Sequence, residues 1–192
     1  MPQGFLAFVL HAHLPFVRHP EHEEFLEEDW FYQAITETYI PLIHMFEGLM
    51  RDQVPFRLTM SLTPTLLSMM EDPLLQERYI RHLESSLELA EKEVNRTQGD
   101  DQFHPLALYY QKRFREAHTT FCDRYQRNLI SAFRKVMEAG HLEIVTCGAT
   151  HGFLPPMETQ PNAIRAQIEV AARTHERLLG RRPRGIWLPE CG

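Results

Sequence analysis

The stretch "FLAFVLHAHLPF" (residues 5–16) is nearly continuous apolar sequence that reaches Pro15. Such a run is typical of a parallel strand buried on both faces, because strands with one wet face alternate apolar and polar residues. His11 and His13 are two residues apart, so they share one face at the C-terminal end of this strand. The stretch therefore predicts a parallel sheet with two histidines at one of its strand ends.

Working outward from it, the sequence predicts three further strands, at 54–62, 141–150 and 184–190. The residues between 64 and 140 have apolar stripes at helical spacing and read as helices, broken by a polar loop at 95–105. Strands that alternate with helices indicate a parallel α/β sheet or barrel. We therefore expect an α/β fold of four parallel strands, with a long helical insertion between the second and third.

Two helices outside the insertion are also predicted. Apolar residues recur at helical spacing from Phe31 to Leu49, and Pro41 should kink or split that helix. A second helix is expected over 161–179, with Pro161 in its first turn and Gly180 as its C-terminal cap.

Composition and charge exclude several classes of protein. The 192 residues are 43% hydrophobic and 24% charged, which is ordinary for a globular protein. The net charge of −6 offers no electrostatic attraction for nucleic acid or for an anionic membrane. Three cysteines are an odd number without framework spacing, which favours free thiols in a reducing cytoplasm.

Polar side chains follow the end of every predicted strand. They are His11, His13, Ser61, Thr63, Thr150, His151 and Glu190. The C-terminal ends of parallel strands are where α/β proteins bind ligands, so these residues predict one site. Glu190 ends the apolar run "GIWLP" and is expected at the edge of a buried strand, where an unpaired carboxylate is costly unless it serves chemistry. Glu143 lies near the start of its strand, away from this end, and is expected to form a structural ion pair.

Structural and metal-binding interpretations of these residues remain open. Each histidine could be a satisfied structural residue, and Trp187 and Trp30 could pack rather than stack on a sugar. Alternatively His11, His13 and His151 could bind zinc while Glu190 activates water, as in a hydrolase or deacetylase. No His-x-x-x-His or Asp motif completes a familiar zinc set, which disfavours that alternative.

Three motifs closely resemble glycoside hydrolase family 57. They are "HAHLPF" (11–16), "HLEIVTCGATHGFLP" (141–155) and "GIWLPECG" (185–192), in the family's order and spacing. The helix "EDWFYQAITETYIPLI" (28–43) resembles the branching enzymes of that family, so the likeness extends over essentially the whole chain. The resemblance implies that residues 1–192 are the N-terminal portion of a catalytic domain, an incomplete seven-stranded (β/α) barrel with its helical insertion at about 64–140.

The resemblance also implies an activity and roles. It implies retaining chemistry on α-1,4-glucans without a metal or cofactor, most directly the formation of α-1,6 branches, with α-amylase or 4-α-glucanotransferase as related activities. Glu190 matches the catalytic nucleophile. His11, His13 and His151 match residues that line the sugar subsite, and Trp187 is expected to help shape it.

The second carboxyl group that a retaining enzyme needs is the remaining question. The family supplies it as an Asp in a fourth motif further along the chain, which this sequence does not reach. We therefore expect a fragment that is inactive alone, with the missing part as a separate partner chain, and an open apolar edge at the fourth strand that promotes association. The alternative to an enzyme is a noncatalytic glucan-binding or partner subunit.

Overall fold

A three-stranded parallel sheet forms the centre of the molecule. The computed structural model describes residue 4 and residues 6–192. The strands β1 (Val9–Ala12), β2 (Leu58–Leu62) and β3 (Leu142–Val145) lie in the order β1-β2-β3, and all are parallel. The predicted parallel α/β class is confirmed. Each observed strand is shorter than its prediction, and Phe5, where the first predicted strand begins, lies outside the described residues.

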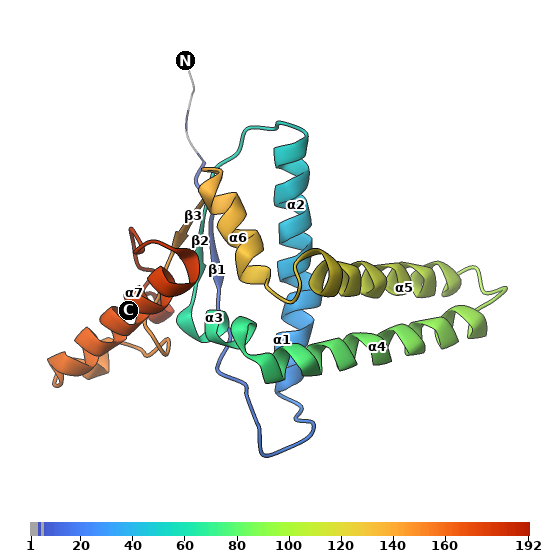
Figure 1. Ribbon diagram of the computed structural model, residues 1–192, viewed down its shortest axis with the longest axis horizontal. Coiled ribbons are helices and arrows are strands. Elements are labelled where there is room, and N and C mark those ends of the chain that lie inside the picture. Colours follow the sequence, from blue (N-terminus) through green and yellow to red (C-terminus); the bar gives the residue numbers. More distant parts are fainter. Residues whose placement is uncertain (1–3, 5) are drawn as a thin grey trace.

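Helices fill most of the remaining chain. They are α1 (Glu28–Ala34), a π-helix (Ile35–Tyr39), α2 (Ile40–Arg51), α3 (Pro64–Glu71), α4 (Pro73–Arg96), α5 (His104–His118), a second π-helix (Thr119–Arg124), α6 (Leu129–Glu138), a 3₁₀ turn (Pro155–Met157), α7 (Pro161–Leu179) and a 3₁₀ turn (Pro189–Cys191). Gly180 caps α7 in the left-handed conformation, with φ 79°, as its position predicted. The helices α4 and α5 form a long hairpin that projects away from the sheet (Figure 1).

Pro41 splits the first helical stretch, as expected, through a change in its hydrogen-bond pattern. Proline has no amide hydrogen and its ring clashes with the carbonyl four residues before it. The π-helix Ile35–Tyr39 immediately precedes this position, and the amide of Ile40 reaches back five residues to the oxygen of Ile35. The wider π turn lets the chain continue into α2 past the proline.

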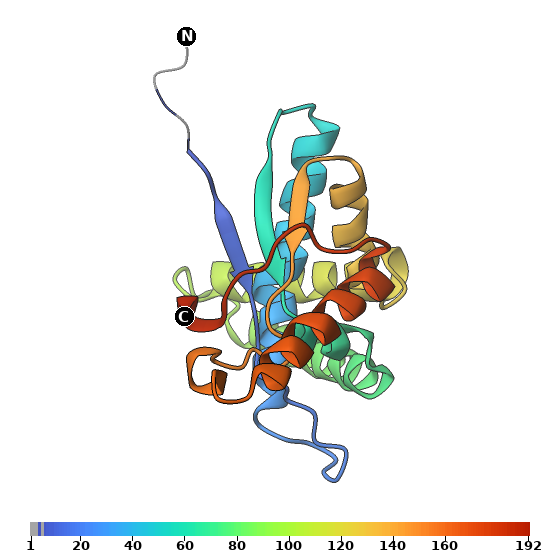
Figure 2. The same cartoon turned by 90° about the vertical axis from the view of Figure 1, so that its left-hand side faces the viewer.

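The apolar core lies between the sheet and the helices on one of its sides. Helices α2 and α6 run alongside the strands (Figure 2), and α7 packs against α3 and α6. The largest fully buried side chains come mainly from α1, the π-helix after it, α2, β2, α3, α4 and α6 and include Phe31, Ile35, Phe46, Met60, Leu66, Tyr79 and Phe133. This packing holds the three parallel strands side by side, so that their C-terminal ends lie at the same end of the sheet.

The fourth predicted strand, at 184–190, does not form a ladder. Ile186 makes a single parallel bridge to Thr146, closed by hydrogen bonds from the Thr146 amide to Gly185 and from the Trp187 amide to Thr146. The segment lies beside β3, where a fourth strand would be, but Pro189 cannot donate a ladder hydrogen bond and the chain turns into a 3₁₀ turn there. The prediction of four strands is therefore corrected to three strands and one bridge.

The first strand is also more open than its sequence suggested. β1 pairs with β2 on one side only, and Val9 and His11 are exposed. Phe8, just before it, is 57% exposed. An apolar run alone does not distinguish a central strand from an edge strand, because both positions tolerate the same residues.

Among the described helices, none combines the length and apolar character needed to cross a membrane.

Candidate functional site

Three histidines from two strand ends meet in one stack. His11 lies in β1, His13 follows it, and His151 follows β3 by a short loop. The ring centroids of His13 and His151 are 3.7 Å apart at an interplanar angle of 17°, and those of His11 and His151 are 5.1 Å apart. The sequence placed these residues at one sheet edge, and the structure brings their rings into contact.

Hydroxyl groups on the neighbouring strand orient two of the rings. His11 is paired in register with Ser61 of β2, and its Nδ1 lies 2.5 Å from the Ser61 Oγ. The Nδ1 of His13 lies 3.2 Å from the Oγ1 of Thr63, which also caps the N-terminus of α3. No described residue hydrogen-bonds to the Nε2 of His11 or His13, so each ring has one nitrogen left for a ligand.

Partial desolvation and the neighbouring imidazoles lower the pKa of both rings, although His11 is exposed and His13 is half-buried. Desolvation lowers the pKa of His11, with a further contribution from His151, against which Glu190 acts in the opposite direction. It lowers the pKa of His13 to about 4, helped by His151 and then His11. A neutral imidazole can accept as well as donate a hydrogen bond, so the pair suits ligand hydroxyl groups, which do both.

His151 connects the stack to the expected nucleophile. Its Nε2 lies 3.5 Å from the Oε1 of Glu190, and its Nδ1 lies 3.1 Å from the Sγ of Cys147. Burial raises the pKa of the Cys147 thiol, which therefore keeps its hydrogen and can donate it to Nδ1. That contact favours the ring tautomer with its hydrogen on Nε2, facing the carboxylate.

The expected burial of Glu190 was wrong. Its side chain is 74% exposed, whereas that of His151 is 7% exposed. The physical reason is the missing ladder, since a segment held by one bridge leaves its last residues in solvent. Both Glu190 and His151 have positive φ, 52° and 56°, which is strained for residues other than glycine. Such strain is most common at functional sites.

Two other predicted residues have different places. The ring of Trp187 lies 6.2 Å from that of His11 at a tilted angle, so it borders the site. Thr150 instead faces α7, where its Oγ1 accepts a hydrogen bond from Gln167. Sequence reasoning assigned no role to Cys147 or Thr65, although Cys147 sits in the same motif as His151, and the Oγ1 of Thr65 is 3.1 Å from that of Thr63.

The zinc interpretation finds no support in the geometry. Metal ligands direct in-plane nitrogen lone pairs at one point, whereas His13 and His151 lie face to face. Within residue 4 and residues 6–192, no group of three or more His, Cys, Asp or Glu side chains is arranged to hold a metal ion. Imidazoles and a carboxylate gathered at the strand ends of a parallel α/β fold can instead hydrogen-bond a ligand rich in hydroxyl groups.

Comparison with protein families identifies the family to which the chain belongs. The model for glycosyl hydrolase family 57 matches residues 7–192, and the chain belongs to that family.

Similar proteins of known structure share the fold. An alpha-amylase of Thermotoga maritima, AmyC, has a TM-score of 0.92 at 48% identity, over 97% of this chain and 35% of that one. A family 57 branching enzyme of Pyrococcus horikoshii has a TM-score of 0.89 at 34% identity, over 98% of this chain and 35% of that one. A curated 1,4-alpha-glucan branching enzyme of Thermococcus kodakarensis is 35% identical over 98% of this chain. This chain spans 27% of the length of that curated relative and matches its N-terminal part.

Proposed function

We propose that this chain carries the nucleophile and part of the sugar subsite of a retaining enzyme that transfers segments of α-1,4-glucans. The observation that supports the proposal is the 3.5 Å approach of Glu190 to the end of a stack of three histidines. In this proposal His11, His13 and His151 hydrogen-bond the hydroxyls of the sugar at the cleavage point, and Trp187 shapes its border.

The chemistry assigns Glu190 a covalent step. Its carboxylate attacks the anomeric carbon and forms a glycosyl-enzyme ester as the bond from that carbon to the leaving sugar oxygen breaks. A second carboxyl group, about 5–5.5 Å away, protonates the leaving oxygen and later removes a proton from the acceptor hydroxyl. We propose that this group is an Asp from a segment beyond the part of the relatives that this chain matches.

The identity of the acceptor separates two candidate activities. If a glucan 6-hydroxyl attacks the intermediate, the product is an α-1,6 branch, and we propose this activity first because relatives named as branching enzymes match 98% of the chain. If water attacks, the enzyme hydrolyses the glucan. That second candidate is favoured by the alpha-amylase AmyC, whose 48% identity exceeds the 34% of the Pyrococcus horikoshii branching enzyme.

The remaining parts of the proposal concern partners and location. We propose that activity requires the complementary segment, as part of one polypeptide or as a separate chain, and that residues 1–192 act as the N-terminal portion of the catalytic domain. We also propose a cytoplasmic location, which fits three cysteines that form no disulfide with one another. A noncatalytic glucan-binding subunit is the outcome that would replace this proposal.

The test is to co-express the chain with the remaining part of the Pyrococcus horikoshii branching enzyme and assay amylose conversion. We expect new α-1,6 branches, lost by at least about a thousandfold in Glu190→Gln, because the amide cannot form the covalent intermediate. Glu176→Gln, at an exposed position on α7, is the matched control and should retain activity. Reducing ends without branches would identify hydrolysis, and a folded glucan-binding complex without either product would contradict the assignment of Glu190.

A further inference from the structure

A polar cavity lies beside the loop that joins β1 to α1. It has a volume of about 450 Å³ and is bordered by the loop, the first turn of α1 and the middle of α4. Its lining includes Phe25, Leu26, Asp29, Arg78, Arg81 and Ser85. None of the histidines of the candidate site belongs to it. We propose that this cavity is a second carbohydrate-binding site, which takes a stretch of the same glucan that the proposed function assigns to the first.

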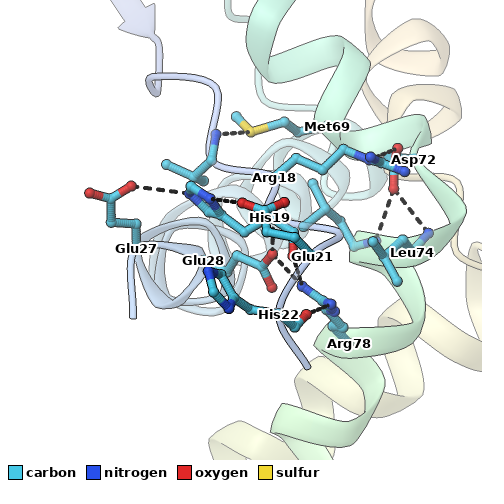
Figure 3. A network of polar contacts seen from close by, with 12 residues as sticks. Arg18, His19, Glu21, His22, Glu27, Glu28, Met69, Asp72, Leu74 and Arg78 are labelled. Atoms are coloured by element: carbon cyan, nitrogen blue, oxygen red, sulfur yellow. Dashed lines mark hydrogen bonds and ion pairs between the residues drawn. The ribbon is translucent and has the colours of Figure 1, made fainter. Parts of the chain in front are cut away.

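The wall of the cavity is held rigidly by a buried ion pair. From α4, the Arg78 guanidinium donates a hydrogen bond to the Oε1 of Glu28 at 2.5 Å and another to the backbone oxygen of His19 at 3.2 Å (Figure 3). The carboxylate of Glu28 also accepts hydrogen bonds from the His19 amide and the Tyr32 hydroxyl. The loop, α1 and α4 therefore meet in one fixed geometry, which favours preformed binding.

An unused hydrogen-bond donor group lines this wall. Arg81, one helical turn beyond Arg78, borders the cavity, is exposed and makes no ion pair with any described residue. Arg78 is only 7% exposed and bonds to Glu28 and to the loop backbone, so it supports the wall. Arg81 can therefore donate to the oxygen atoms of a ligand, because its guanidinium is both accessible and unpaired.

The charges of the lining select a neutral ligand. Four carboxylates and two guanidinium groups border the cavity, so an anion such as phosphate meets an excess of negative charge. Among the described residues, these carboxylates are not gathered into a group that could hold a metal ion. A sugar satisfies both sets of groups, because each hydroxyl accepts from a guanidinium and donates to a carboxylate such as Asp29. The 80% exposed Leu26 offers apolar surface for the C–H faces of the ring, next to Phe25, whose own ring stacks on that of His19 at 3.7 Å.

The arrangement along the chain explains why the two sites would share one glucan. The loop that begins directly after His13 leads to Phe25 and Leu26, so the cavity lies on the side of the sheet where the strands end. A remote site of this kind can supply binding energy that positions a long substrate.

The test is a titration of the chain with maltohexaose, followed by amide chemical shifts in NMR spectra. We expect two sets of shifted signals, one around Asp29, Arg81 and Ser85 and one around His13 and His151. Arg81→Ala should weaken the affinity at the first set about tenfold and leave the second unchanged, because it removes one charge-assisted hydrogen bond. Ser85→Ala should act in the same direction, and Arg115→Ala, an exposed arginine on α5, should change neither.

The outcomes separate this inference from the proposed function on which it rests. Shifts around His13 and His151 alone would overturn the second site and leave the proposed function standing. Shifts around Arg81 alone would support the second site and contradict the sugar-binding role of the histidines. Shifts at neither place would contradict both. Shifts around Arg81 that Arg81→Ala and Ser85→Ala leave intact would also overturn the second site.

Discussion

At the scale of single residues, His13 makes the stability of the molecule depend on pH. Its pKa in the folded chain is about 4, below the ordinary value of 6.5, because it is half-buried and lies beside two other imidazoles. Below pH 6.5 the unfolded chain binds a proton at this ring that the folded chain does not. We therefore expect the unfolding temperature to fall as pH decreases from 6.5 to 4, with no contribution from His13 above that range.

A variant isolates this contribution from those of other groups. Thermal unfolding followed by circular dichroism at several pH values should show a smaller loss between pH 6.5 and 4 for His13→Gln than for the unaltered chain. His175 is fully buried and also has a lowered pKa, so the unfolding temperature of the variant should still fall somewhat over this pH range. Identical pH profiles for the two proteins would show that His13 does not titrate as the structure indicates.

Residue types and strand periodicity located the site but not its exposure. His11, His13, His151 and Glu190 were grouped from their positions at predicted strand ends, and their distances confirm that they lie together. Their roles stay predictions. The burial of Glu190 was wrong because exposure depends on which segments cover a strand end, and a linear pattern holds no such information.

At the scale of elements, the loop between β1 and α1 depends on α4. Glu28 is 1% exposed and Arg78 is 7% exposed, so each neutralises the other in the interior. Burial raises the pKa of Glu28, but hydrogen bonds from Arg78, the His19 amide and Tyr32 outweigh it and leave the pKa lowered. Glu28→Gln should reduce the free energy of unfolding by about 3 kcal/mol, because it leaves the Arg78 charge buried without a partner.

The neighbouring residue provides the control. Glu27→Gln changes a side chain that is 47% exposed and pairs with His19 alone among the described residues, so its effect should stay below about 1 kcal/mol. Both values come from urea unfolding of the two variants. A hydrophobic double variant, Glu28→Leu with Arg78→Met, should recover much of the loss because it removes both charges. Equal effects of the two glutamine variants would contradict this account.

The sequence predicted the order and type of the helices and strands better than it predicted where each begins and ends. The helices at 64–140 and the helix at 161–179 formed where apolar stripes at helical spacing predicted them. Glu143, expected in a structural ion pair, lies 3.7 Å from Arg181 and 3.6 Å from Arg184. The fourth strand failed because a ladder requires a continuous partner, and Pro189 interrupts the pairing that Ile186 begins.

At the scale of the whole molecule, exposed apolar residues lie along both edges of the sheet, at β1 and beside β3. On the β1 side, Leu6 is 79% exposed, Phe8 57% and Val9 44%. On the β3 side, Ile186 is 39% exposed and Leu188 43%. Open apolar strand edges pair readily with other chains. The sequence led us to expect this liability at the fourth strand only, whereas the structure also places it at β1.

We therefore expect the isolated chain to self-associate through the β1 edge. Phe8→Lys with Val9→Lys should weaken association at least about tenfold, because charged lysines on an edge strand oppose pairing with another chain. Sedimentation velocity over a range of protein concentrations measures the effect. Leu106→Lys is the control, since Leu106 is 52% exposed but lies on α5, in the hairpin that projects away from the sheet. If the control variant dissociates the chain and the edge variant does not, the hairpin is the contact, and a monodisperse unaltered monomer would contradict association altogether.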